Sequence, residues 1–385
     1  MTDRPRRNER RTDLAYAVGL GLGILFVVFL GPLDRRLELV HINDFSGFWA
    51  GARAVVLGID PYDPQRWRDA TIAFGTQTPD TPVYGYFPWV AVALVPLALL
   101  PLDVAAWVWM VATVAIAAVA LRALLRAYLP GRPVEHAVLG GALLVSQPGF
   151  HSLVLGQWSF AFVAALSAVT LALRSGRFGR AATAALVLMA KPQLFVFAAV
   201  PLARPRVLRI AVPAGLGIVA LATLVLPHWI VAWTSDVAPA RLARNATVPI
   251  ALGDLAGPAG TIAGYLLIVV GVVVATRFGA RGDASLAVWL ALSSAGALYA
   301  WSYDHLILLV PIVIAAGVLA AHGRRTARLV ALGGAGILLV VSPVMYVLAV
   351  SRHRESFSAV IPVLVFVLIV SALWSLRREP LGSPR

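Results

Sequence analysis

The chain has 385 residues, of which 60% are hydrophobic and only 13% are charged. Soluble globular domains carry about 45–50% apolar and about 25% charged residues, so this composition excludes a soluble enzyme, a disordered protein and a coiled coil. We predict an all-α polytopic membrane protein, because a spanning helix needs about 20 apolar residues and this length could supply about a dozen. We expect a single transmembrane domain over residues 1–376 and a cytoplasmic tail over residues 377–385.

Charge and cysteine content narrow the classes further. The formal net charge is +14 at pH 7, but no segment combines a basic face with interleaved aromatic residues, so we expect no nucleic-acid partner. Basic residues are instead typical of the cytoplasmic flanks of spanning helices. The chain has no cysteine, which excludes disulfides, zinc thiolate sites, iron–sulfur clusters and cysteine nucleophiles.

The first predicted spanning helix covers residues 14–33. Five arginines precede it and should stay cytoplasmic, so the helix runs outward and residues 34–103 form the first outer loop. Within this loop, Asp44 begins a predicted short helix that would lie along the membrane surface. Residues 88–100 are apolar, but they are too few for a span and are interrupted by proline, so we expect them to lie in the interface.

A second ambiguous segment covers residues 181–202, with Lys191 at its centre. A single span would place this ammonium in mid-bilayer, at a cost of roughly 2.5–3.5 kcal/mol. We favour two short helices that meet near Lys191, because they place it at the outer side and keep the following arginines inside. The remaining predicted helices cover residues 104–124, 137–150, 158–173, 207–226, 259–276, 285–300, 305–321, 328–349 and 358–376, and residues 228–257 form a second outer loop.

Polar side chains that could perform chemistry gather on the predicted outer face. With cytoplasmic N- and C-termini, a multi-pass protein of a bacterial inner (cytoplasmic) membrane would therefore present its active site to the periplasm. The alternative is that these loops are simply solvated and that aromatic residues anchor the helices at the interface. The candidate residues are Asp44, Trp49, Arg53, Tyr62, Tyr84, Tyr86, His151, Gln157, Lys191, Asp304 and His305.

The first-loop candidates each have a structural alternative. Asp44 could be a catalytic base or the N-cap of its helix. Tyr62 lies in a turn-forming cluster and could serve only the turn. Tyr84 and Tyr86 could stack on a sugar or belong to an interfacial aromatic belt.

The candidates in the short loops have alternatives of the same kind. The amide of Gln157 suits sugar hydroxyls but could cap a helix end. Lys191 could bind a lipid phosphate or extend its ammonium to the interface. Asp304 could bind substrate or complement a helix dipole, and His305 could act in the site or be a packed polar residue.

The order of these motifs resembles glycosyltransferase family 87, a polyprenol-phosphate-mannose-dependent mannosyltransferase-like group of the GT-C superfamily. The resemblance covers about residues 10–325. It rests on the order of the motifs and on the side of the membrane where each is predicted to lie. The motifs are Asp44 after the first helix, Gly58 to Tyr62, the Tyr84-x-Tyr86-x-Pro88 run, Gly156-Gln157, Lys191-Pro192 and Asp304-His305. It implies a GT-C fold with juxtamembrane helices in the first outer loop.

The resemblance also implies a polyprenyl-phosphate sugar donor and an inverting transfer with no cofactor or metal. It implies that Asp44 is the general base and that His305, at the start of a late helix, contributes to the site. The short second outer loop and the lack of an acidic pair after Asp44 depart from the family pattern and leave the acceptor, a glycolipid or a glycan, open.

The chemistry of the residues agrees with this reaction. One carboxylate can deprotonate an acceptor hydroxyl, and a nearby cation can stabilise the departing phosphate. We therefore predict Asp44 as base, Lys191 and Arg53 at the donor phosphate, and the other candidates, His305 and Gln157 among them, at the sugar or acceptor. The alternatives are a secondary transporter, a lipid-linked glycan ligase or polymerase of the cell envelope, and a non-catalytic lipid-binding partner.

Overall fold

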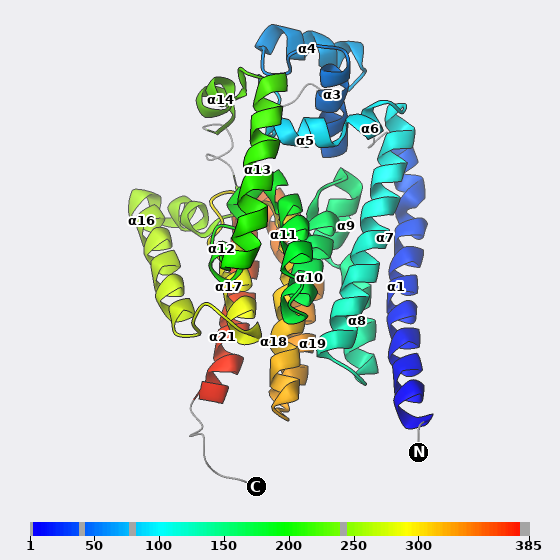
Figure 1. Cartoon of the computed structure of the whole chain (residues 1–385), viewed down its shortest axis with the longest axis vertical. Helices are drawn as coiled ribbons and strands as arrows, with labels where there is room; N and C mark the ends of the chain where they lie inside the picture. The colour runs from blue at the N-terminus through cyan, green and yellow to red at the C-terminus, as the bar shows by residue number, and fades with distance from the viewer. Residues whose placement is uncertain (1–2, 38–42, 77–81, 239–244, 378–385) are drawn as a thin grey trace.

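The computed structural model describes residues 3–37, 43–76, 82–238 and 245–377, excluding the side chains of residues 3–7, 29–37 and 377. The regular elements in these ranges are all helices (Figure 1). Eight helical stretches among the described residues are long and apolar enough to cross a membrane, and three shorter apolar helices accompany them. The chain is therefore an all-α, multi-pass membrane protein, as predicted.

The eight long stretches include several that combine two or three consecutive helices. They are α1 (Asp3–Leu37), α7 (Leu102–Tyr128), α8 with α9 (Pro133–Val145, Gln147–Leu155), α13 (Pro205–Val225), α16 (Val248–Thr276), η4 with α18 (Ser302–Leu308, Leu309–Ala321), α19 with η5 and α20 (Thr326–Gly336, Ile337–Val341, Ser342–Arg352), and η6 with α21 (Glu355–Ala359, Val360–Trp374). The shorter apolar helices are α10 (Ser159–Arg174), α11 with η1 (Phe178–Leu186, Val187–Ala190) and α17 (Asp283–Ala295).

Helix boundaries depart from the predicted ones mainly at two long helices. α1 extends beyond both ends of the predicted 14–33 span and continues to Leu37. α16 begins at Val248, inside the predicted second outer loop, and kinks at Ala256 and Gly257 just before the predicted start at residue 259. η7 (Ser375–Arg377) ends the described chain, so the rest of the predicted 377–385 tail lies outside the described residues.

Neither ambiguous segment forms one continuous span. Residues 88–100 form two short helices, α5 (Pro88–Ala93) and α6 (Val95–Ala98). The helical run that starts with α11 stops at Lys191, and only η2 (Pro192–Leu194) and α12 (Ala199–Leu202) follow it before α13. The predicted break at Lys191 is therefore present, although the second half contains much less helix than expected.

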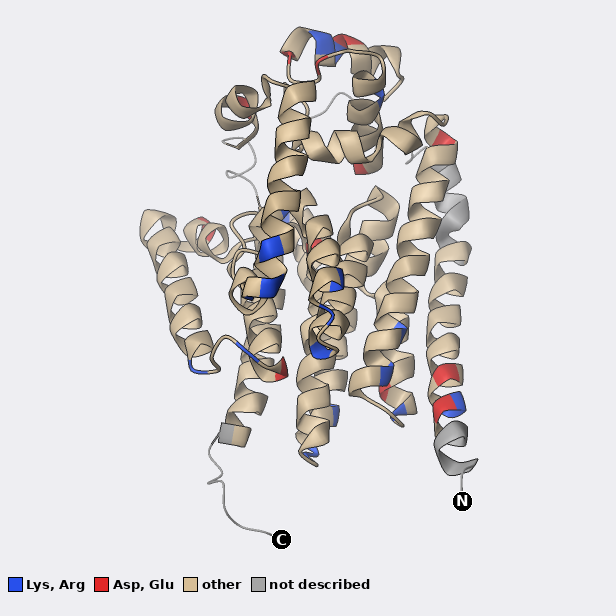
Figure 2. Ribbon diagram, in the orientation of Figure 1, with Lys and Arg blue, Asp and Glu red and all other residues tan. Residues whose placement is uncertain are grey.

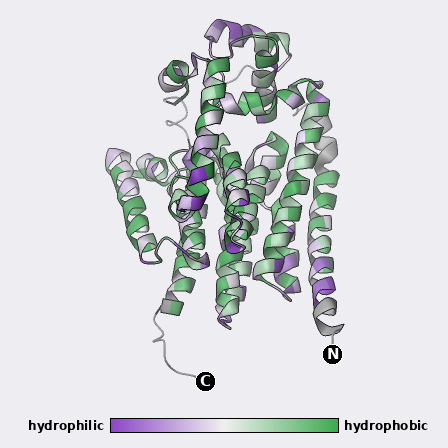
Figure 3. Cartoon of the chain, in the orientation of Figure 1, coloured by the Kyte–Doolittle hydropathy of each residue, from purple (hydrophilic) through white to green (hydrophobic). Residues whose placement is uncertain are grey.

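Two neighbouring helices, α17 and α18, are buried along most of their length, while several of the long helices around them face outward. α18 is buried on all sides, and Gly317 lets it approach so closely that a Cβ there would lie 2.6 Å from Tyr128. In contrast, α7, α13 and α20 expose large apolar side chains such as Leu224, which is 81% exposed. Figure 3 shows that hydrophobic residues predominate along the long helices. Such a surface suits lipid contact.

The two predicted outer loops meet at one end of the bundle. α3 (Asp44–Val56), α4 (Pro64–Ala73), α5, α6, α14 (Trp229–Ala232) and the π-helical η3 (Trp233–Val237) gather there (Figure 1). The Phe87 ring stacks on Trp233 with centroids 4.7 Å apart, and His228 Nδ1 lies 2.8 Å from Asp60 Oδ2. Residues from the two predicted outer loops therefore build one layer.

The predicted surface orientation of the Asp44 helix is wrong. α3 stands upright, roughly parallel to α1 and α7 (Figure 1). The reason is its burial, since Phe45, Phe48, Trp49 and Ala52 are all buried and the helix packs on more than one face. An interfacial helix would instead keep one polar face in water.

Candidate active site

Asp44 lies at the first turn of α3, where the helix meets the transmembrane bundle. The N-cap of α3 is Asn43, whose side chain accepts a hydrogen bond from the Ser46 amide at 3.1 Å. Asn43 also donates from Nδ2 to the Val154 carbonyl at 3.2 Å, which fixes the helix start against α9. The alternative that Asp44 serves as the N-cap is therefore wrong, because Asn43 occupies that position.

Gln157 is the immediate partner of Asp44. Its Nε2 donates a hydrogen bond to Asp44 Oδ2, and the Gln157 side chain is only 1% exposed. Gly156, at the C-cap of α9, places it there with a φ of 65°, a conformation that glycine adopts without strain. A Cβ at Gly156 would lie 2.6 Å from Phe45 Cβ, so glycine also permits close contact with α3. Gln157 therefore links two helices instead of capping one.

Lys191 connects this pair to a second carboxylate. Its Nζ donates to Gln157 Oε1 at 3.0 Å and to Asp304 Oδ1 at 2.9 Å. The ammonium also lies 4.6 Å from the centroid of the Tyr303 ring. Only 3% of the Lys191 side chain is exposed, so the snorkelling alternative is wrong.

Asp304 is held by its own helix as well as by Lys191. It lies in the first turn of η4, where its Oδ2 accepts a hydrogen bond from the Trp301 amide at 3.0 Å. The carboxylate therefore caps the start of η4 with one oxygen and pairs with the lysine through the other. The structural interpretation of Asp304, an acid in the first turn of its helix, is therefore confirmed, whereas its role in substrate binding stays a prediction.

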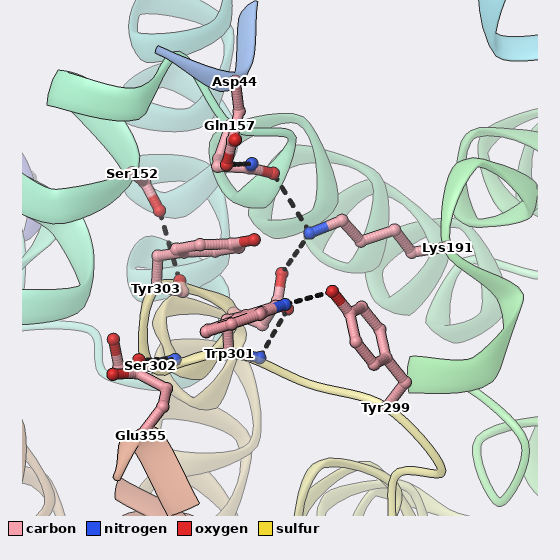
Figure 4. A network of polar contacts seen from close by, with 10 residues as sticks. Asp44, Ser152, Gln157, Lys191, Tyr299, Trp301, Ser302, Tyr303 and Glu355 are labelled. Atoms are coloured by element: carbon pink, nitrogen blue, oxygen red, sulfur yellow. Dashed lines mark hydrogen bonds and ion pairs between the residues drawn. The ribbon is translucent and has the colours of Figure 1, made fainter. Parts of the chain in front are cut away.

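Together these contacts form one continuous buried network, shown in Figure 4. It runs from Asp44 through Gln157 and Lys191 to Asp304, and it joins the start of α3 to η4. In a low-dielectric interior, a buried charge is tolerated when it is paired and hydrogen-bonded, as Lys191 is here. The network can therefore fix the orientation of the one member that is only partly buried, Asp44.

A second polar cluster adjoins the Tyr303 side of this network. His151 Nδ1 lies 3.2 Å from Ser302 Oγ and 3.2 Å from Gln147 Nε2. Glu355 accepts a hydrogen bond from the Ser302 amide at 3.1 Å, and Gln147 accepts one from Ser342 at 2.7 Å. His151 is therefore close to the predicted site, whereas Gln147, Ser302, Glu355 and Ser342 were not predicted as site residues.

His305 follows Asp304 on η4 but lies in a different environment. Its side chain is fully buried, and neither ring nitrogen has a hydrogen-bond partner in the described part of the chain. Its predicted role in the site stays a prediction.

Arg53 and Trp49 lie further along α3 and make structural contacts. Arg53 Nη1 donates to the Ala98 carbonyl at 3.1 Å, and Trp49 Nε1 donates to the Leu100 carbonyl at 3.1 Å. Nine residues separate Arg53 from Asp44, which corresponds to about 13 Å along a helix. The described contacts therefore do not bring Arg53 to the Lys191 ammonium.

Tyr62, Tyr84 and Tyr86 form an aromatic group next to α3. The Tyr62–Tyr84 and Tyr84–Tyr86 ring centroids lie 5.9 and 5.6 Å apart, and Tyr86 packs edge-on against Phe48 at 4.4 Å. Tyr62 donates its hydroxyl hydrogen bond to the Tyr86 carbonyl, and burial raises the pKa of Tyr62 well above its ordinary value. Tyr84 is 1% exposed, so sugar stacking by this group stays a prediction.

The unpredicted residues carried only weak signals in the sequence. Gln147 lies between Ser146 and Pro148, a sign of a helix break, and Glu355 follows a basic run before the last helix. Nothing in the sequence connects these two residues, and in the structure each of them bonds to Ser302. Within the described ranges, no three His, Asp or Glu side chains are grouped as metal ligands would be.

Comparison with known proteins adds one finding. The sequence model of glycosyltransferase family 87 matches residues 84–343, which is more than half of the chain and includes Gln157, Lys191 and Asp304. The matched region begins after Asp44. No curated protein and no solved structure matches the chain.

Proposed function

The chain belongs to glycosyltransferase family 87, and from this premise we propose a donor, a chemistry and a base for it. The protein transfers a sugar, mannose being the family default, from a polyprenyl-phosphate donor to a glycolipid or glycan acceptor. The transfer inverts the anomeric centre and takes place on the outer face of a bacterial inner membrane. Asp44 is the general base.

The observation that carries this proposal is the link of Asp44 to Gln157, Lys191 and Asp304. A general base needs a carboxylate that a substrate can reach and that is held in one orientation. Asp44 is only half-buried, whereas its three network partners are buried. A rigid support beneath a reachable carboxylate fits that requirement.

The proposed reaction is a single displacement. Asp44 takes the proton from an acceptor hydroxyl as that oxygen attacks the anomeric carbon of the donor sugar. The bond between the anomeric carbon and the phosphate oxygen breaks, and polyprenyl phosphate leaves with the electron pair. An inverting transfer needs one base, in contrast to the nucleophile and acid of a retaining enzyme.

We assign two roles to Lys191. Its charge stabilises the departing phosphate, and its contact with Gln157 positions the Asp44 carboxylate. Arg53 is the weaker candidate for the phosphate. It lies about 13 Å from Asp44 along α3, and its guanidinium donates a hydrogen bond to the Ala98 carbonyl. Substrate-orienting roles for His151, His305 and the aromatic group remain part of the proposal.

The test is a transfer assay with purified protein, labelled polyprenyl-phosphate mannose and a lipid extract of the host. We expect label to move into a new product, whose anomeric configuration is opposite to that of the donor by NMR. A parallel reaction with a pyrophosphate-linked sugar distinguishes a glycan ligase or polymerase. Transfer only from the pyrophosphate donor, or retention of configuration, would overturn the proposed donor or mechanism.

A further inference from the structure

A recess lies at the far end of α10 from Gln157. The C-terminal ends of α7, α10 and α18 meet there with the start of α17. Arg174 at the end of α10 stacks on the ring of Tyr128 at the end of α7, so these two helices end at the same level. A cavity of about 960 Å³ lies between the four helix ends.

The walls of this recess carry an excess of positive charge. Arg132, Arg174, Arg204 and Arg281 line it, whereas Asp283 is the one carboxylate in the lining. Four arginines against one aspartate leave a net charge of +3. Figure 2 shows that many Lys and Arg positions lie in the lower half of the bundle as drawn, towards the end where α1 begins and α21 ends.

Two of the arginines are already engaged. Arg132 Nη1 lies 3.3 Å from Glu135, and Arg174 Nη1 lies 3.8 Å from Asp283. The Arg174 guanidinium also stacks 4.6 Å from the centroid of the Tyr128 ring. These contacts fix the two guanidinium groups but neutralise only part of the local charge.

Arg204 and Arg281 differ from Arg132 and Arg174 in their contacts. Arg204 Nε is buried and has no hydrogen-bond partner among the described residues, and Arg281 is exposed with no ion pair in that same part of the chain. A buried unsatisfied donor is costly, and a guanidinium matches the geometry of a phosphate. The unsatisfied donor is therefore an independent sign that the recess accepts an anion.

We propose that this recess binds the phosphate group of an anionic ligand, either a glycerophospholipid headgroup or a free phosphate. Arg204 and Arg281 contact the phosphate, while Arg132 and Arg174 contribute long-range attraction. The apolar side chains of Phe278, Leu286 and Val318 also line the recess, which gives a lipid a surface for the start of its acyl chains. The site is separate from the Asp44 network, because the length of α10 lies between them.

The experiment uses the full chain in neutral detergent. Binding of dioleoyl phosphatidylglycerol is measured by native mass spectrometry, with dioleoyl phosphatidylcholine as the zwitterionic comparison. The variants are Arg204→Gln and Arg281→Gln, and the control is Arg328→Gln, an exposed arginine near the start of α19 that does not line the recess. Arg281→Gln guards against misfolding, because the Arg281 side chain is exposed.

We expect each recess variant to weaken phosphatidylglycerol binding by about tenfold or more, as the loss of a charge-assisted hydrogen bond predicts, and the control to match wild type. Inorganic phosphate distinguishes the two sources. Displacement of the lipid by phosphate indicates a site for the phosphate alone, and retention of the lipid indicates a headgroup site. Equal phosphatidylglycerol affinity for wild type, both recess variants and the control would overturn the proposal.

Discussion

The ammonium of Lys191 lies 2.9 Å from the carboxylate of Asp304, although 113 residues separate them in the chain. Both side chains are almost fully buried, at 3% and 1% exposure. Removal of one member of such a pair leaves an uncompensated charge, which costs more than the pair itself contributes. This relationship makes the site sensitive to single substitutions and tolerant of matched ones.

The free energy of unfolding should depend directly on the ion pair between Lys191 and Asp304. We expect Lys191→Met to destabilise the protein by about 3–5 kcal/mol, because it leaves Asp304 unpaired. The double variant Lys191→Met/Asp304→Asn removes both charges and should recover most of that loss, since the oxygen of the introduced carboxamide can still accept from the Trp301 amide. Thermal unfolding in detergent measures both. A double variant as unstable as the single one would show that charge imbalance is not the cause.

Substitution of Gln157 should lower kcat much more than it changes KM. Gln157→Leu removes the donor to Asp44, and we expect kcat to fall about 10- to 100-fold with little change in KM. Gln65→Leu, on the exposed face of α4, is the matched control. A change in KM alone would argue against positioning.

Tyr62 allows a test of stability against pH. The hydroxyl bond to the Tyr86 carbonyl should make wild type about 1 kcal/mol more stable than Tyr62→Phe at neutral pH. Since burial raises the pKa of Tyr62 in the folded protein, only the unfolded chain ionises this residue near pH 10. The stability contributed by the neutral side chain is therefore complete below about pH 10 and is lost as pH rises above it. Unfolding of both proteins from about pH 7 to about pH 11 should show the difference shrinking; a constant difference would contradict the burial argument.

Much of the fold could be predicted from the sequence, because the membrane sets both the number of apolar residues in a spanning helix and the side on which arginines lie. The break at Lys191 is an example, since a lone ammonium in mid-bilayer is costly. The upright orientation of α3 could not be predicted, because its burial depends on aromatic partners that are distant in the sequence, among them Tyr86, Trp109 and Trp158. Nor could the meeting of Gln147 and Glu355 at Ser302 be predicted, as these contacts arise only from tertiary packing.

The predicted site residues divide in the same way. Asp44, Gln157, Lys191 and Asp304 follow a motif order that marks them in the sequence, and the structure brings them together. Arg53 carries the same outer-face signal, but its described hydrogen bond is to the Ala98 carbonyl, and its role at the phosphate stays a prediction. The predicted membrane side and the order of the motifs can therefore select candidate site residues. The distance of each candidate from the Asp44 network then ranks them, and this distance is known only from the structure.

The most direct test of the account is transfer by Asp44 variants. We would measure initial rates with labelled polyprenyl-phosphate mannose for wild type, Asp44→Asn and the control Asp69→Asn, which alters an exposed carboxylate on α4. Asp44→Asn should lose at least about 100-fold in kcat and keep the unfolding temperature of wild type, while Asp69→Asn keeps the full rate. A folded Asp44→Asn protein that transfers mannose at the wild-type rate would contradict the assignment of Asp44 as the base.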